Sequence, residues 1–200
     1  MDHYFTADAA PLDPAELTER AVRLAGFEGT VVTAPGVFCA HRVDLGTAVL
    51  LRTVAAGPLP TSGTLVDLGC GWGPLALVMA KLAPQATVWG IDINPRALEL
   101  TRLNAARWGL TNLQVATPEA ASDLAPDLIW SNPPIRVGKE VLHDLLTTWL
   151  DRLTPHGYAD LVVQKNLGAD SLQTWLTAHG YPTGKLASAK GYRVLRARRA

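Results

Sequence analysis

Hydrophobic and polar positions change their period at regular intervals from residue 64 onward. Short apolar runs typical of buried strands alternate with longer segments in which apolar residues recur every three or four positions, as on one helix face. The predicted strands span 65–68, 86–91, 113–116, 127–130, 159–163 and 192–197, and the predicted helices span 74–82, 95–108, 139–153 and 169–179. Such alternation predicts an α/β fold with a doubly wound, mostly parallel sheet and helices on both faces.

Several helix boundaries carry their own signals. Pro74 and Pro95 stand at expected first helical positions, where the missing N–H costs nothing, and Asn94 is a suitable N-cap. Gly109 and Gly180 follow expected helices and are typical of left-handed C-caps. These residues support the predicted alternation independently of the apolar pattern.

The pattern before residue 58 is different. Residues 30–40 predict a strand or a hairpin around Pro35-Gly36, and residues 45–56 predict an amphipathic helix capped by Asp44. We therefore expect an N-terminal extension, residues 1–57, that packs on a core formed by residues 58–200.

Composition limits the possible classes of protein. With 200 residues and 48% hydrophobic content, the chain fits one compact domain better than two. No secretory signal opens the chain and no run of eighteen apolar residues occurs. Cys39 and Cys70 show neither metal-ligand spacing nor a disulfide framework. The sequence therefore predicts a cytoplasmic protein with no bound metal and no membrane contact, and it leaves the oligomeric state undetermined.

Charge is balanced overall but unevenly distributed. Lys plus Arg and Asp plus Glu both number 18, so the net charge gives no argument for a polyanionic partner. Residues 185–199, however, hold six basic residues and no acid. This basic tail is either a solvated terminal strand or a nucleic-acid contact.

A glycine-rich turn joins the first predicted core strand to the helix after it. The turn contains Gly69, Cys70, Gly71, Trp72 and Gly73. Glycines allow a tight turn and let the backbone approach a ligand at the helix N-terminus. Asp67 precedes the turn, and Asp92 ends the next strand. The pattern predicts a cofactor site, with a plain strand-to-helix turn as the structural alternative.

The side chains around this turn distinguish between two cofactor classes. A dinucleotide fingerprint would need Gly or Ala where Pro74 stands, and Asp67 would repel a pyrophosphate. Asp67 and the turn carbonyls suit the α-ammonium group of S-adenosylmethionine, and Asp92 suits its ribose hydroxyls. The sequence therefore predicts S-adenosylmethionine as the cofactor.

Asn132-Pro133-Pro134-Ile135 follows the fourth predicted strand, where open α/β sheets bind their ligands. The Asn132 side-chain carbonyl and the Pro133 backbone carbonyl can each accept one N–H of an amine, which aims its lone pair at the sulfonium methyl. The two prolines stiffen the loop and remove competing backbone donors. The motif predicts methyl transfer to a planar amine nitrogen, with a rigid turn as the alternative.

These motifs together resemble the class I methyltransferases, and specifically a small-domain branch related to the 16S rRNA guanine-N2 methyltransferases. The matching segments are His3-Tyr4-Phe5, Gly36-Val37-Phe38, Asp44-Leu45-Gly46-Thr47, Asp67 to Gly73, Asp92-Ile93-Asn94-Pro95, Asn132-Pro133-Pro134-Ile135-Arg136, Gln164-Lys165 and Lys190-Gly191-Tyr192.

The resemblance implies a Rossmann-like sheet of seven strands with its last strand antiparallel, and residues 58–200 as the methyltransferase core. It implies that Asn132 and Pro133 hold the amine, that Ile135 lies against the target base, and that the segment around Thr47 folds over the cofactor. The catalytic residues it implies are Asn132, Pro133, Pro134 and Ile135. The cofactor-binding residues are Thr47, Asp67, Gly69, Cys70, Gly71, Gly73, Asp92, Ile93 and Asn132.

Two positions depart from the pattern of the family. Ile135 stands where many relatives have an aromatic residue, which leaves the identity of the base open. Pro118-Glu119 stands where relatives usually present an acid to the adenine amino group. Arg136 and Lys139 follow the catalytic loop and either steer RNA phosphates or solvate the next helix.

The leading hypothesis is methyl transfer to an exocyclic nucleobase amine, guanine N2 in ribosomal RNA, with ribosomal RNA or the small ribosomal subunit as partner. Methylation of adenine in nucleic acid, or of a glutamine amide in a protein, suits the same motif. A non-catalytic cofactor-binding module is an alternative of another class, and Pro74 disfavours a nicotinamide-dependent oxidoreductase.

Overall fold

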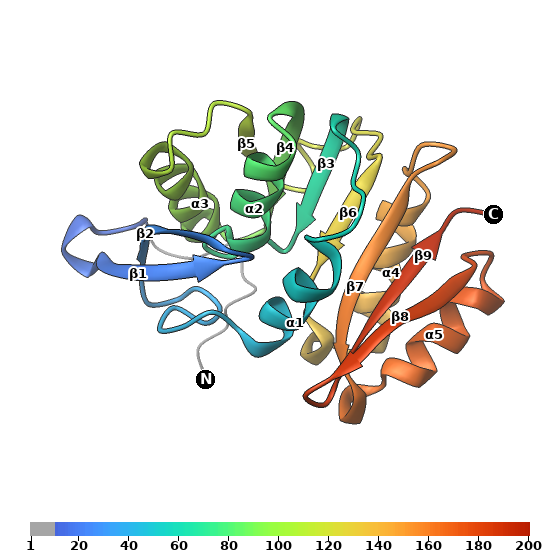
Figure 1. Ribbon diagram of the computed structural model, residues 1–200. Helices are drawn as coiled ribbons and strands as arrows, with labels where there is room; N and C mark the ends of the chain where they lie inside the picture. The colour runs from blue at the N-terminus through green and yellow to red at the C-terminus, as the bar shows by residue number, and fades with distance from the viewer. Residues whose placement is uncertain (1–10) are drawn as a thin grey trace.

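A seven-stranded sheet forms the centre of the molecule (Figure 1). The computed structural model describes residues 11–200, so His3-Tyr4-Phe5 lies outside the described residues. The strands follow the order β5-β4-β3-β6-β7-β9-β8. Their bounds are β3 Ser62–Leu68, β4 Gln85–Ile91, β5 Leu113–Ala116, β6 Leu128–Ser131, β7 Tyr158–Gln164, β8 Thr183–Ala189 and β9 Tyr192–Arg198.

Strand pairing confirms the predicted fold class. The five strands from β5 to β7 pair in parallel, and β9 pairs antiparallel with both β7 and β8. The chain leaves β3 toward β4 on one side and returns to β6 on the other. The carboxyl ends of β3, β4 and β6 therefore meet at the point where the strand order reverses, which is where such sheets bind ligands.

Helices cover both faces of the sheet, as predicted (Figure 1). Helices α1 Leu45–Val54, α2 Pro74–Leu82 and α3 Pro95–Arg107 share one hydrophobic cluster, and α4 Lys139–Leu150 and α5 Ala169–Ala178 share the other. Successive residues of one strand point into opposite clusters, since Leu65 packs with the first and Val66 with the second. Burial on both faces explains the continuous apolar runs in the sequence.

The predicted helix caps are confirmed. The Asn94 side chain accepts a hydrogen bond from the Arg96 N–H at 3.0 Å, and the Asp44 carboxylate accepts one from the Thr47 N–H at 3.1 Å. Gly109 and Gly180 follow α3 and α5 with φ of 63° and 88°.

The N-terminal hairpin differs from its prediction. Strands β1 Thr18–Leu24 and β2 Phe27–Thr33 pair antiparallel, and Ala25 and Gly26 form the turn with φ of 49° and 93°. A two-residue turn of this hand needs positive φ at both positions, which a proline cannot adopt. The strand alternative predicted within residues 30–40 is confirmed as far as Thr33, where β2 ends. The hairpin alternative around Pro35-Gly36 is wrong, because residues 34–44 form an irregular connection to α1.

Strand β8 is absent from the sequence-based prediction. It is an edge strand with mostly exposed residues, so it lacks an apolar run, and its register shifts between Lys185 and Ala187. The basic tail proves to lie on β8, β9 and the residues after them. Two of its arginines form ion pairs inside the fold: Arg193 with Asp170, and Arg196 with Asp160, which accepts hydrogen bonds at 2.7 and 2.8 Å.

One buried side chain attaches the hairpin to the rest of the molecule. Asn104 of α3 accepts a hydrogen bond from the Val32 N–H at 2.6 Å and donates to the Val32 and Trp72 carbonyls at 3.0 and 2.9 Å. The ion pair of Arg96 with Glu16 adds a second link between the N-terminal segment and α3. Asn104 thus connects β2, α3 and the glycine-rich turn.

Candidate active site

The glycine-rich turn lies between the end of β3 and the start of α2. Gly69 and Cys70 donate backbone hydrogen bonds to the Ile91 carbonyl at 2.8 and 3.0 Å, which ties the turn to β4. Gly69 has a φ of 79°, and a Cβ added there would meet no atom within 4 Å. A Cβ at Gly73 would instead lie 3.0 Å from Thr101. The turn is therefore closed toward α3 and open at Gly69, where a ligand can approach the backbone.

Asp67 places a buried carboxyl group beside this turn. One of its oxygens, Oδ2, accepts a hydrogen bond from the Ala76 N–H at 2.9 Å, whereas the buried Oδ1 has no hydrogen-bond partner among the described residues. Burial, with a smaller contribution from the nearby Asp92, raises the pKa of Asp67 to about 8 against the lowering effect of the Ala76 hydrogen bond. A buried unpaired carboxylate oxygen is costly and calls for a cationic partner, so Asp67 fits the α-ammonium of S-adenosylmethionine.

Asp92 faces the same space from the end of β4. Its Oδ2 accepts a hydrogen bond from the Gly71 N–H at 3.0 Å and its Oδ1 accepts one from the Asn94 N–H at 2.9 Å. Burial raises the pKa of Asp92 above its ordinary value. Each carboxylate oxygen can accept more than one hydrogen bond, so Asp92 can still bind ribose hydroxyls.

Two adjoining cavities collect the residues of the predicted motifs. The larger, of about 320 Å³, is lined by Gly69, Gly71, Asp92 and the segment from Asn132 to Ile135. The smaller, of about 30 Å³, is lined by Thr47, Asp67, Cys70 and others. The residues that line both are Phe38, Cys39, Asp44, Gly69, Gly71 and Asn132.

Two predicted cofactor residues do not line either cavity. Gly73 is the N-cap of α2, and Ile93 is 38% exposed at the end of β4. Cys70 lines the small cavity, but burial raises the pKa of its thiol well above the ordinary value, and it accepts a hydrogen bond from the Thr101 hydroxyl at 3.5 Å. Pro118 and Glu119 are absent from both linings, whereas Asn94 and Ala97 line the larger cavity near β4.

The Asn132 amide has a fixed orientation. Its Nδ2 donates hydrogen bonds to Asp44 Oδ2 at 2.8 Å and to Thr47 Oγ1 at 3.2 Å. An ionised carboxylate can only accept, so the NH2 group must face Asp44. Both amide hydrogens are then used, and the Oδ1 carbonyl remains the group that can accept a hydrogen bond from a ligand.

The rest of the motif forms a tight turn beside Asn132. The Pro133 carbonyl accepts a hydrogen bond from the Ile135 N–H at 2.9 Å, at the start of the short 3-10 turn η2 Ile135–Val137. A carbonyl has two lone pairs, so Pro133 can accept a second hydrogen bond. Ile135 is half-buried and lines the larger cavity.

The structure adds residues that motif-based reasoning did not place at a site. Asp44 was predicted as a helix cap and lies in a segment that the resemblance matched, but it was not among the predicted site residues. Phe38, Gln164 and Tyr192 line the larger cavity from other matched segments. Cys39 and Leu167 line it as well.

No group of three or more His, Cys, Asp or Glu side chains within residues 11–200 can hold a metal ion. None of the helices described is long and apolar enough to cross a membrane.

Fold and site together define a class of protein. A seven-stranded sheet with an antiparallel β9, a glycine-rich turn after β3 and buried acids at the ends of β3 and β4 are the features of class I S-adenosylmethionine-dependent methyltransferases. The family model described as "Methyltransferase small domain" matches residues 28–196. The chain belongs to this family and is an S-adenosylmethionine-dependent methyltransferase.

Individual relatives agree with this assignment. The chain is 30% identical over 202 residues to the uncharacterised protein YbxB of Bacillus subtilis, covering 99% of this chain and 98% of the relative. It is 34% identical to ribosomal RNA small subunit methyltransferase C of Pseudomonas aeruginosa (strain UCBPP-PA14), covering 96% of this chain and 58% of that protein.

A solved structure has the same fold. The T. thermophilus 16S rRNA N2 methyltransferase RsmC, in complex with AdoMet and guanosine, superposes with a TM-score of 0.80 at 28% identity. The match covers 96% of this chain and 53% of the solved chain. The chain thus spans little more than half of these ribosomal RNA methyltransferases and almost all of YbxB.

Proposed function

We propose that this methyltransferase acts on an exocyclic amine of a nucleobase, and that its substrate is guanine N2 in ribosomal RNA. The observation that carries the proposal is the Asn132 carbonyl, which Asp44 and Thr47 hold as a hydrogen-bond acceptor in the wall of the larger cavity. Such a carbonyl binds an NH2 group and does not bind an acceptor-only edge of a base.

The cofactor residues have distinct roles in this proposal. Asp67 binds the α-ammonium through its unpaired Oδ1, and Asp92 binds the ribose hydroxyls. Gly69, Cys70 and Gly71 present their backbone groups to the cofactor. Thr47 forms part of the cavity wall, and its hydroxyl accepts a hydrogen bond from the Asn132 side chain. S-adenosylmethionine, when bound, supplies a methyl group on a sulfonium, and the neutral thioether that leaves needs no acid.

Asn132 and Pro133 provide the alignment that the reaction needs. Each carbonyl accepts one N–H of the amine, which draws the nitrogen toward a tetrahedral shape and directs its lone pair at the methyl carbon. Methyl transfer from the sulfonium to the nitrogen would release a neutral thioether, and the extra proton on the nitrogen would pass to solvent. Ile135 contacts the flat face of the base with its apolar side chain.

The choice of substrate rests on the relatives. Two of them carry names that specify small-subunit ribosomal RNA, and one was solved with guanosine. RNA, as free ribosomal RNA or within the small subunit, is therefore the proposed partner, and the cytoplasm is the proposed location. Residues 1–57 and 58–200 are proposed to act as the extension and the methyltransferase core of one compact domain.

Labelled methyl transfer tests the proposal. The purified chain is incubated with labelled S-adenosylmethionine and under-methylated small ribosomal subunits, and the RNA is digested and analysed for N2-methylguanosine. Asn132→Ala is expected to lower the rate at least about 100-fold, because alignment by the carbonyl is lost. Gln114→Ala, which removes an exposed amide on β5, is the matched control and keeps the wild-type rate.

The methylated product distinguishes the alternatives. If the product is N6-methyladenosine, or if the label is found in ribosomal protein, the substrate is another planar amine and not guanine. The proposed role of Asn132 would then be unchanged. RNA label at the same level in Asn132→Ala and wild type would refute the proposal. Heat in a calorimetric titration with S-adenosylmethionine, together with no label in RNA or protein, would instead indicate a non-catalytic module that binds the cofactor without transfer.

A further inference from the structure

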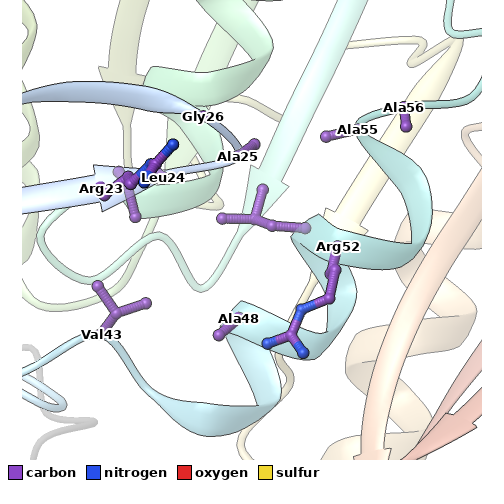
Figure 2. A pocket seen from close by; sticks show the side chains of 10 residues that line it. Arg23, Leu24, Ala25, Gly26, Val43, Ala48, Arg52, Ala55 and Ala56 are labelled. Atoms are coloured by element: carbon purple, nitrogen blue, oxygen red, sulfur yellow. The ribbon is translucent and has the colours of Figure 1, made fainter.

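A groove separates the N-terminal hairpin from helix α1. Two adjoining cavities of about 450 and 460 Å³ form it, and both are lined by Arg23 and Val43; the first reaches α1, and the second lies beside residues 41–43. Figure 2 shows the first cavity, with Arg23 on the hairpin side and Arg52 extending from α1 on the other. The groove lies outside the two cavities that hold the predicted cofactor residues.

The charge of this groove is strongly positive. Its lining contains Arg20, Arg23, Arg42 and Arg52 but Glu19 as its single carboxylate among the described residues. Glu19 is already paired with Arg107 at 2.6 Å. In a chain of zero net charge, this concentration of arginines is a local feature that favours an anionic ligand.

Three of these arginines are available to a ligand. Arg20 is fixed inside the fold, because its Nε donates to the Thr33 hydroxyl and to the Ala40 carbonyl. The exposed Arg23 has a 3.6 Å contact with the equally exposed Glu28, which is a weak interaction in water. The exposed side chains of Arg42 and Arg52 have no ion pair or hydrogen bond with any described residue.

The floor of the groove is apolar. Leu24, Val43 and Leu51 line it together with the short side chains of Ala48 and Ala55. A volume of about 450 Å³ above small apolar side chains accommodates a flat ring. Single-stranded RNA matches both the charge and the apolar floor of the groove, since its phosphates pair with arginine and its unstacked bases contact apolar surface.

The groove begins next to the active site. Arg42 stands two residues before Asp44, which holds the Asn132 amide. The Arg42 N–H donates a hydrogen bond to the carbonyl of Cys39 at 3.3 Å, and Cys39 lines the active-site cavity. Trp72 lines both the second cavity of the groove and the smaller cavity of the site. A strand that enters the cavity with one nucleotide can therefore continue into the groove with its neighbours.

We propose that this arginine groove, formed by Arg23, Arg42 and Arg52 over the apolar floor, binds the single-stranded RNA segment next to the methylated nucleotide. The inference rests on the proposed RNA substrate. The groove is favoured over the basic tail because its arginines line a cavity beside the active site, whereas two of the six basic residues of the tail, Arg193 and Arg196, are already paired with carboxylates.

RNA binding without methylation tests the groove. A fluorescent single-stranded oligoribonucleotide of about ten nucleotides, a length typical of one small binding surface, is titrated with the wild type and with the double variant Arg42→Gln, Arg52→Gln at several salt concentrations. Loss of two phosphate contacts should weaken binding about tenfold or more and make the slope of log affinity against log salt less steep by about 1.4. Arg102→Gln, which removes an exposed arginine of α3 paired with Glu99, should change neither.

Two further measurements separate this inference from the proposed function. Cofactor affinity by calorimetry should be unchanged in the double variant, which shows that it is folded. If the wild type methylates no RNA but the double variant still reduces the salt slope, the proposed function fails and the groove stands. If the double variant keeps the wild-type affinity, salt slope and KM for RNA, the groove proposal fails and the proposed function stands.

Discussion

At the scale of single residues, the orientation of one amide determines what the site can bind. Asp44 accepts hydrogen bonds from both the Asn132 side chain and the Thr47 backbone through the same oxygen. It therefore caps α1 and positions Asn132 at once. A carboxylate that accepts from the amide NH2 group also polarises the amide and makes its carbonyl a stronger acceptor.

Asp44→Asn tests this positioning role. Asparagine is as good an N-cap as aspartate, so α1 should be retained, but its neutral amide no longer forces the Asn132 NH2 group to face it. We expect kcat for methyl transfer to fall about 10- to 100-fold through lost alignment, with less than about a threefold change in cofactor Kd. Steady-state kinetics, with the substrate that the wild type methylates, measures kcat, and calorimetry measures the cofactor Kd.

Asp13→Asn provides the matched control for this variant. Asp13 also caps a helical turn, the 3-10 turn η1 Pro14–Glu16, where its carboxylate accepts a hydrogen bond from the Ala15 N–H at 2.9 Å. The Asp13→Asn variant should leave kcat for methyl transfer unchanged. Equal kcat values for wild type and Asp44→Asn would show that Asp44 serves α1 alone.

At the scale of elements, the hairpin depends on a single buried polar contact with α3. Asn104 is fully buried and satisfies both backbone groups of Val32. It also fixes the Trp72 carbonyl within the glycine-rich turn. The hairpin, which forms one wall of the arginine groove, is thereby coupled to the cofactor turn.

Asn104→Ala should weaken this coupling. Removing the side chain leaves the Val32 N–H and carbonyl groups buried without partners, so we expect the free energy of unfolding to fall by about 1–3 kcal/mol. Denaturant unfolding measures this change, and hydrogen exchange in residues 27–33 should speed up. Asn166→Ala at an exposed position should stay within about 0.5 kcal/mol of wild type, and a similarly small effect for Asn104→Ala would refute the prediction.

The elements also show where sequence-based prediction reached its limit. Strands buried on both faces, such as 65–68 and 127–130, were found because their apolar runs have no other explanation. Strand β8 was missed because an edge strand needs only its backbone to pair with β9. The hairpin turn was misplaced because Ala25-Gly26 lacks the Asn or Asp that usually marks such turns.

At the scale of the whole molecule, buried acids make stability depend on pH. Burial raises the pKa values of Asp67, Asp92 and Asp160 above their ordinary values. For Asp67 the value rises from 3.8 to about 8, so between these pH values the folded chain keeps a proton that the unfolded chain has lost. Unfolding then releases that proton, and this contribution to stability falls as pH rises through the window.

The difference in stability between wild type and Asp67→Asn isolates this effect. From about pH 5.5 to about pH 7.5, the unfolding free energy of the wild type should fall relative to the variant by at most about 1.4 kcal/mol per pH unit. Saturating S-adenosylmethionine should reduce the fall, because its ammonium group pairs with the ionised carboxylate. Denaturant unfolding across this pH range measures both curves.

Asp123→Asn, which changes an exposed acid, is the control and should follow the wild-type pH profile. Parallel profiles for wild type and Asp67→Asn would contradict the raised pKa of Asp67. If bound cofactor leaves the pH profile of wild-type stability unchanged, that result would contradict the pairing of Asp67 with the ammonium group.

The sequence by itself determined the fold class and the positions of two motifs, whose chemistry it predicts. Apolar period and glycine position depend on local geometry, so the sheet, the cofactor turn after Asp67 and the loop at Asn132 were predictable from short segments. Local signals also sufficed for the caps at Asp44 and Asn94.

Only the tertiary structure decided how these segments act on one another. Asp44 and Asn132 are 88 positions apart in the chain and meet at 2.8 Å, and no local pattern encodes such a contact. The same holds for Asn104 with Val32 and for the arginines of the hairpin and α1 that share one groove. The direction of the Asn132 carbonyl, and with it the proposed preference for an amine, is a product of packing between distant elements.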